Sequence, residues 1–100
     1  MKHIDLLKYS PSISEKEDGQ KIYQMIKDAN PSINEVEIDM SSIKAMATFC
    51  AKQIFGTLYK ELTPSIFYKN IKLRGVSKNV KLSIMLGIEG ALLSAPKNND

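Results

Sequence analysis

The chain has 100 residues, of which 43% are hydrophobic and 25% charged, with a formal net charge of +3 at pH 7. This length allows one domain with a modest core and excludes two separate cores. We expect a single domain over residues 1–95, followed by a flexible polar tail over residues 96–100.

Residue counts exclude several classes of site. One cysteine, Cys50, and one histidine, His3, cannot supply a zinc site of the usual kind, so we expect no metal and no cofactor. The lone cysteine and the lack of a signal peptide indicate a cytoplasmic protein, and no apolar run approaches the roughly 20 residues that a membrane span needs. The positive charges are scattered and include one arginine, which argues against nucleic-acid binding.

The first third of the chain predicts a strand and then a helix. Residues 3–7 alternate as a strand. Ser14 and Glu17 have the spacing of a capping box, which predicts a helix that starts at the serine and ends before Pro31. Gly19 lies in the first turns of this helix, where it weakens the helix unless another group approaches closely.

The rest of the chain repeats this order twice. Residues 33–40 alternate between apolar and acidic side chains as a second strand. After a polar turn, a second helix has an apolar stripe and is bounded by Pro64; residues 65–70 are then a connection, with at most a short helical turn. Residues 71–76 form the third expected strand, and residues 80–93 the third helix. The stripe of the second helix consists of Ala51, Ile54, Phe55, Leu58 and Leu62.

Alternation of strand and helix predicts βαβ units and a mainly parallel sheet with right-handed crossovers. Charges at every second residue of the second and third strands indicate that one sheet face looks to solvent or to a partner. We therefore predict an α/β two-layer sandwich with helices mostly on one face. The pattern leaves the direction of the first strand open.

The strand that ends in Ile38-Asp39, the polar turn, the small hydroxyl residue and the amphipathic helix together resemble the STAS fold, which includes bacterial anti-sigma-factor antagonists. The chain is most similar to a STAS-like subfamily of uncharacterised function. The resemblance covers roughly residues 14–93. The motifs that carry it are Lys16-x-x-Gly19, Ile38-Asp39-Met40-Ser41 and Thr48-Phe49.

This resemblance implies a regulatory module of bacterial-type signalling that binds another protein and is not an enzyme. Anti-sigma-factor antagonists bind a kinase-like partner, which phosphorylates a serine within an Asp-Ser-Ser-Gly run at the start of the second helix. By spacing, the equivalent residues are Ala47, Thr48, Phe49 and Cys50. The resemblance thus implies Thr48 as a candidate phosphoacceptor, and a kinase-like ATPase or an anti-sigma factor as a candidate partner.

We predict no catalytic residues and a partner-binding surface made of Ser41, Ser42, Thr48, Phe49 and Lys52. Thr48 can also be an N-cap of the second helix, and the two roles are compatible. Phe49 lies off the apolar stripe, so it is either tucked beneath the preceding loop or exposed at an interface.

Two neighbouring groups have ordinary structural interpretations. Cys50 is expected to be a buried structural thiol, because no companion base is evident. Asp39, Ser41 and Ser42 favour turn chemistry over nucleophilic catalysis, because nothing places His3, the only histidine, beside them.

The third helix has two apolar sides. Val80, Ile84, Ile88, Ala91 and Leu92 form the expected core stripe, and Gly87 and Gly90 favour close helix packing. The second side is predicted to contribute to a homodimer or partner interface, unless the core wraps further around the helix. This second side consists of Leu82, Leu86 and Leu93.

Two alternatives from other functional classes stay open. A small enzyme or ligand-binding domain would use the C-terminal ends of the strands, where Asp39, Ser41 and Ser77 could line a site. A structural subunit of a homo- or hetero-oligomer would suit the leucine excess of the last helix.

Overall fold

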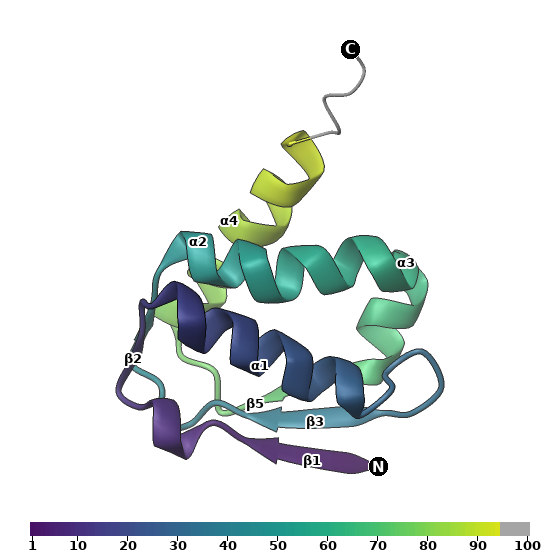
Figure 1. Ribbon diagram of the computed structural model, residues 1–100, viewed down its shortest axis with the longest axis horizontal. Coiled ribbons are helices and arrows are strands. Elements are labelled where there is room, and N and C mark those ends of the chain that lie inside the picture. The colour runs from purple at the N-terminus through teal and green to yellow at the C-terminus, as the bar shows by residue number, and fades with distance from the viewer. Residues whose placement is uncertain (95–100) are drawn as a thin grey trace.

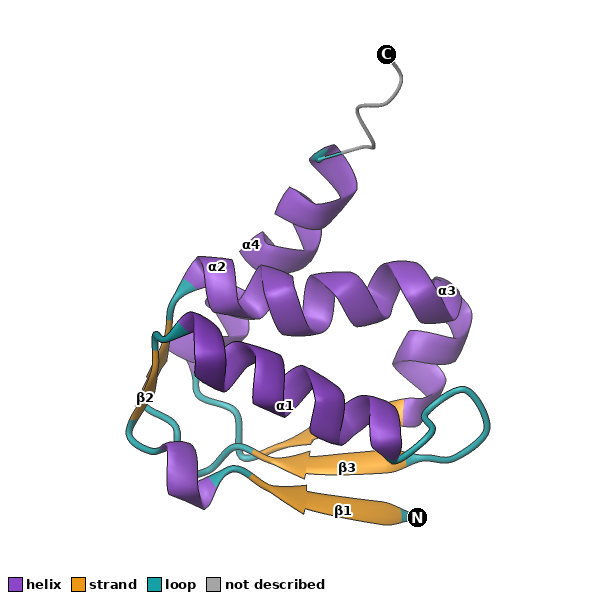
Figure 2. Ribbon diagram, viewed as in Figure 1, coloured by secondary structure: helices purple, strands orange, loops and turns teal. Residues whose placement is uncertain are grey.

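The computed structural model describes residues 1–94. A parallel sheet forms one layer, and the α-helices all lie on the same side of it (Figures 1 and 2). The predicted α/β two-layer architecture with a parallel sheet is therefore confirmed. The tail expected over residues 96–100 lies outside the described residues. Within residues 1–94, no helix is both long and apolar enough to cross a membrane.

The main sheet contains the three predicted strands in the order β1-β3-β5. Their bounds are Lys2–Asp5 for β1, Val36–Asp39 for β3 and Ile71–Arg74 for β5. Both neighbouring pairs are parallel, so β1 runs in the same direction as the other two strands. All three strands therefore end at the same edge, where the polar turn after β3 begins.

The two faces of this sheet differ in burial. Ile4 pairs with Ile38 beneath the helices, and both side chains are buried. On the opposite face, the Glu37 Oε1 atom lies 2.8 Å from His3 Nδ1 and 3.6 Å from Arg74 Nη1. The alternation in the sequence correctly predicted one covered face and one charged, outward face.

The helices follow the predicted order but have different ends. A single turn of 3-10 helix, η1, follows β1. Segment η1 spans Leu7–Tyr9. The other helical segments are α1 (Lys16–Asp28), α2 (Thr48–Ala51), η2 (Lys52–Gly56), α3 (Thr57–Asn70) and α4 (Lys78–Leu93). Segments α2, η2 and α3 run on without a break up to Thr63, and together they form the predicted second helix.

The middle of this long helix, η2, is a π-helix. The backbone N–H of Thr57 donates to the carbonyl of Lys52, five residues earlier. Segment η2 contacts both α1 and α4, and it places Ile54 and Phe55 in the core. Helix α4 approaches so closely that a Cβ atom on Gly87 would lie 2.6 Å from the Lys52 nitrogen. The prediction that glycine in the last helix permits close packing is confirmed at this position.

The capping box predicted at Ser14 is wrong. The N-cap of α1 is Glu15, with extended backbone (φ −108°, ψ 137°), and its side chain makes no capping hydrogen bond. The chain is still extended here because a second, two-stranded parallel sheet pairs β2 (Ser12–Ile13) with β4 (Ala45–Met46). This pairing delays the start of the helix, and no periodic pattern in two-residue strands could predict it.

The end of the second predicted helix is also different. The helical path breaks at Thr63, where φ is 74°, immediately before Pro64, because proline disfavours a helical residue before it. Helical geometry then resumes and continues to Asn70. Residues 65–70, predicted to be a connection with at most a short helical turn, are therefore helical. Asn70 is buried and donates from Nδ2 to the Pro31 carbonyl at 2.7 Å.

Candidate functional site

The site begins at the turn between β4 and α2. Ala47 has extended backbone and donates its N–H to the Ile13 carbonyl at 2.9 Å. Its own carbonyl accepts from Cys50 and Ala51, each at 3.0 Å, which makes Ala47 the N-cap. The prediction that Thr48 caps the helix is therefore wrong, because Thr48 is already its first residue.

The first turn of α2 divides its side chains between core and solvent. Cys50 and Ala51 are fully buried, whereas Thr48, Phe49 and Lys52 are exposed. Phe49 is 54% exposed, so it does not tuck beneath the preceding loop. An exposed aromatic side chain at a helix start is typical of a protein-interaction surface.

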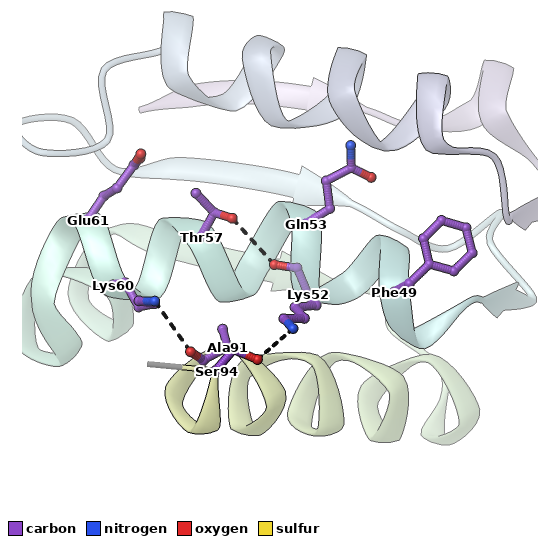
Figure 3. Close-up of a pocket in the computed structure, with 8 residues that line it drawn as sticks. All are labelled: Phe49, Lys52, Gln53, Thr57, Lys60, Glu61, Ala91 and Ser94. Atoms are coloured by element: carbon purple, nitrogen blue, oxygen red, sulfur yellow. Dashed lines mark hydrogen bonds between the residues drawn. The ribbon is translucent and has the colours of Figure 1, made fainter. Parts of the chain in front are cut away.

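Phe49 stands at one end of a groove of about 540 Å³, which we call the Phe49 groove. Figure 3 shows Phe49 at one end, Glu61 at the other, and two lysines between them that point toward α4. The lining side chains come from α2, η2, α3 and the C-terminal end of α4 with its C-cap. They are Phe49, Lys52, Gln53, Thr57, Lys60, Glu61, Ala91 and Ser94.

Both lysines of the groove bond to the C-terminal end of α4. The Lys52 Nζ atom donates to Ser94 Oγ at 2.7 Å, and Lys60 Nζ donates to the Ala91 carbonyl at 3.4 Å (Figure 3). The C-terminal end of a helix carries partial negative charge, which favours ammonium groups at this position. These bonds hold the two cations along one wall of the groove.

Glu61 at the far end of the groove joins α3 to α1. Its two carboxylate oxygens share the single proton of the Tyr23 hydroxyl, at 2.7 and 2.8 Å, and Oε1 accepts from Lys27 Nζ at 3.2 Å. Burial, and then the hydrogen bond to Glu61, raise the pKa of Tyr23; the bond to Glu61 also raises the pKa of Lys27. Glu61 is therefore paired with the cation Lys27, whereas Lys52 and Lys60 bond to uncharged oxygens, so the groove keeps a cationic wall.

Gln53 explains the glycine in α1. Its Nε2 atom donates to the Lys16 carbonyl at 3.1 Å, and its amide lies against Gly19, leaving no space for a Cβ atom there. The Gln53 side chain is thus the group whose close approach accounts for a glycine in the first turns of α1. Gln53 Oε1 is buried and has no hydrogen-bond partner within residues 1–94.

The remaining predicted residues lie at the C-terminal edge of the sheet. Ser41 donates its backbone N–H and its hydroxyl to Asp39 Oδ1, at 2.9 and 2.6 Å, forming the expected turn. These two bonds, the hydroxyl first, lower the pKa of Asp39. Ser41 also lies against Gly75, whose φ is 69°. The Oγ atom of Ser42 is buried and has no partner in the part of the chain that the structure describes.

Three other groups have structural roles. Ser77 is the N-cap of α4 and accepts from the Val80 N–H at 3.2 Å. Cys50 is buried, as predicted, and its thiol donates to the Glu15 carbonyl at 3.6 Å. Burial and then the charges of Asp18 and Glu15 raise the pKa of this thiol, so it is not an activated nucleophile.

The structure thus separates the predicted surface into two parts. Phe49 and Lys52 line the groove with Thr48 beside them in sequence, whereas Ser41 and Ser42 belong to the turn after β3. Sequence reasoning missed the groove residues Lys60, Glu61 and Ser94, because they come together only through the packing of α1, α3 and α4. No cluster of three or more potential metal ligands occurs among residues 1–94.

A family model described as a STAS-like domain of unknown function (DUF4325) matches residues 18–81, which is more than half of the chain. The chain belongs to this STAS-like family. The matched segment includes α2, η2 and α3, and so most of the Phe49 groove. Neither the curated proteins nor the solved structures include a significant match to the chain.

Proposed function

We propose that this STAS-like protein is a cytoplasmic regulatory module that binds a partner protein through Thr48, Phe49 and the Phe49 groove. STAS-like domains are generally non-enzymatic regulatory modules, so family membership supports a role in protein interaction. The observation that carries the proposal is the exposed phenyl ring of Phe49 at the mouth of the groove. With 54% of its surface exposed, this ring lies outside the buried core.

The groove favours a polypeptide with an acidic and an apolar side chain. Lys52 and Lys60 offer cationic donors on one wall, and Phe49 offers an apolar contact at the end. A partner carboxylate could share the two ammonium groups while an apolar side chain packs on the ring. A kinase-like ATPase or an anti-sigma factor is the class of partner that the STAS-like resemblance implies.

The proposal includes a switch at Thr48. This side chain is exposed, and its hydroxyl has no hydrogen-bond partner in the described part of the chain. Phosphorylation adds about −1.5 to −2 charge units at neutral pH. Lys52 lies one helical turn further along the same side of the helix. A phosphate on Thr48 would attract the Lys52 ammonium away from Ser94 and so change the charge of the groove.

The test compares three forms of the tagged chain in pull-downs from the cells that produce it: wild type, Phe49→Ala and Ile33→Ala. Ile33 is 75% exposed and lies outside the groove, so Ile33→Ala controls for loss of an exposed apolar side chain. We expect Phe49→Ala to weaken binding of the purified partner about 30-fold, which corresponds to about 2 kcal/mol. The affinity of Ile33→Ala should equal that of wild type.

The outcomes separate the parts of the proposal. A partner held equally by all three forms would remove the Phe49 groove as its binding site. Mass spectrometry of the captured chain reports phosphate on Thr48. A stable partner with Thr48 unmodified in several growth conditions would remove the switch and leave the binding module. A purely structural subunit, in contrast, should keep its partner when Thr48 is replaced by Glu.

Small-molecule binding is a second candidate, because the volume of the groove is within the roughly 300–1,000 Å³ typical of ligand pockets. The strand-end alternative has less support, since Asp39, Ser41 and Ser77 already bond to neighbouring groups. A thermal-shift screen with metabolites tests this candidate. Strong stabilisation by one compound, abolished by Lys52→Ala, would favour a ligand site in the groove.

A further inference from the structure

Helix α4 has an exposed apolar side along its length, which we call the α4 stripe. Each of its five side chains is at least 44% exposed: Leu82, Met85, Leu86, Leu92 and Leu93. A hollow of about 360 Å³ lies between this stripe and Tyr68 of α3. The sequence predicted Leu82, Leu86 and Leu93 on this side. The prediction that Leu92 belongs to the core is wrong. Ala91 is the last buried residue of α4, and Leu92 is 52% exposed.

The α4 stripe is separate from the face that packs into the domain. Val80, Ile84, Gly87 and Ala91 are buried and turn toward η2 and its neighbours. At about 100° per residue, Leu82 and Leu86 lie on the opposite side of the helix. The stripe therefore faces away from the Phe49 groove, which α4 contacts through Ala91. An occupant of the stripe leaves the groove accessible.

Two charged side chains lie within the stripe and give it a direction. Lys78 is in the first turn of α4, and Glu89 is three turns later on the same side. Both are exposed. Lysine at a helix N-terminus is locally unfavourable, because that end already carries partial positive charge. No acidic residue in the first turn of α4 offsets this charge.

We propose that the α4 stripe binds a second copy of this chain, with the two α4 helices antiparallel about a two-fold axis. Antiparallel pairing places Lys78 of each copy opposite Glu89 of the other. In antiparallel helices, each step forward along one helix is a step backward along the other. The register that pairs Lys78 with Glu89 therefore pairs Leu82 with Met85. This register pairs both charges and places Leu82 and Met85 at the centre, with Leu86 beside them, whereas Leu92 and Leu93 extend past the start of the partner's helix. Parallel pairing would place Lys78 beside Lys78.

The interface would be isologous, with two equal ion pairs at its ends and an apolar centre. The lysine that is unfavourable at its own helix N-terminus would then have a carboxylate partner. The pairing is independent of the proposed function, because each copy keeps its own Phe49 groove. A dimer would present two grooves to a regulatory partner.

Sedimentation equilibrium of the full chain tests the proposal. Wild type should approach twice the chain mass of 11.2 kDa as its concentration rises. Leu86→Glu should sediment as a monomer with an unchanged far-ultraviolet circular dichroism spectrum. Ile33→Glu, which places the same charge at an exposed apolar residue outside α4, should dimerise as wild type does.

Charge reversal tests the antiparallel register. Lys78→Glu and Glu89→Lys should each raise the dimer dissociation constant about tenfold or more, because like charges then face each other twice. The double variant should restore the wild-type constant. Both single changes improve the match of α4 to its own dipole, so unfolding does not explain a loss of dimer. A monomeric wild type, or single variants that dimerise normally, would overturn the proposal.

Discussion

The two ends of the connection between β3 and α2 are held in place by different forces. At the strand end, Asp39 accepts both donors of Ser41, so the polar groups of the turn bond to one another. At the helix start, Cys50 and Ala51 are buried, and packing fixes the backbone without side-chain caps. Asp39 Oδ1 and the Ser41 hydroxyl therefore already have partners within the turn.

The difference therefore decides where a binding surface can form. Packing from the inside leaves Thr48, Phe49 and Lys52 exposed at the helix start. Hydrogen bonding within the turn engages Asp39 Oδ1 and the Ser41 hydroxyl at the strand end. Both places carry an exposed hydroxyl residue, but the Ser41 hydroxyl bonds to Asp39, whereas no bond of the Thr48 hydroxyl occurs within residues 1–94.

The largest expected effect comes from disturbing the packing that holds the helix start. A Cβ atom at Gly87 would meet the backbone of Ala51 and Lys52, and overpacking of this kind costs about 1–3 kcal/mol. Gly87→Ala should lower the free energy of unfolding by that amount in urea denaturation. Gly90→Ala is the matched control, because its Cβ atom would meet only Lys52 Cδ at 3.7 Å. It should raise stability by up to about 1 kcal/mol.

A smaller loss of stability distinguishes Ser77, which caps its helix, from Thr48, which does not. Ser77→Ala removes the hydroxyl that accepts from the Val80 N–H and should lower the free energy of unfolding by about 1 kcal/mol. Thr48→Ala should change it by less than about 0.5 kcal/mol, since the N-cap is Ala47. Equal losses in the two variants, measured by urea denaturation, would show that the Thr48 hydroxyl also stabilises its helix.

The smallest effect concerns the pH dependence of the strand end. The Ser41 bonds lower the pKa of Asp39, so this carboxylate contributes stability above its ordinary value of 3.8. That contribution is lost as the pH falls through the lower, folded-state pKa. Ser41→Ala should raise the pKa of Asp39 toward 3.8 in a carboxyl NMR titration. Partner affinity should stay unchanged; a weakened affinity would place the strand end in the binding surface.

Most of the fold could be predicted because alternation and helical periodicity are local properties of the sequence. Val36 and Ile38 indicated both a strand and its buried face, and the parallel order followed from the order of the elements. The errors arose where a distant contact set the local geometry. Pairing of β2 with β4 moved the N-cap of α1 from Ser14 to Glu15, and no short pattern encodes that pairing.

The candidate site could be predicted only in part, for the same reason. Phe49 was identified because it lies off the apolar stripe of its helix, and Lys52 belonged to the surface predicted around Thr48. The other wall of the groove depends on the crossing of α4 over η2, which brings Ser94 to Lys52 across 42 positions of sequence. Thr48 was misread as a cap because a hydroxyl residue beside an apolar run usually is one.

The π-helix η2 sets the rotational phase between the two ends of the Phe49 groove. Its wide turn accommodates one more residue than an α-helix would between α2 and α3. Deleting one residue there would rotate all of α3 by about 100° relative to Phe49. Lys60 and Glu61 would then face another direction, even if every helix survived. The length of this segment, more than the identity of its residues, therefore keeps the groove assembled.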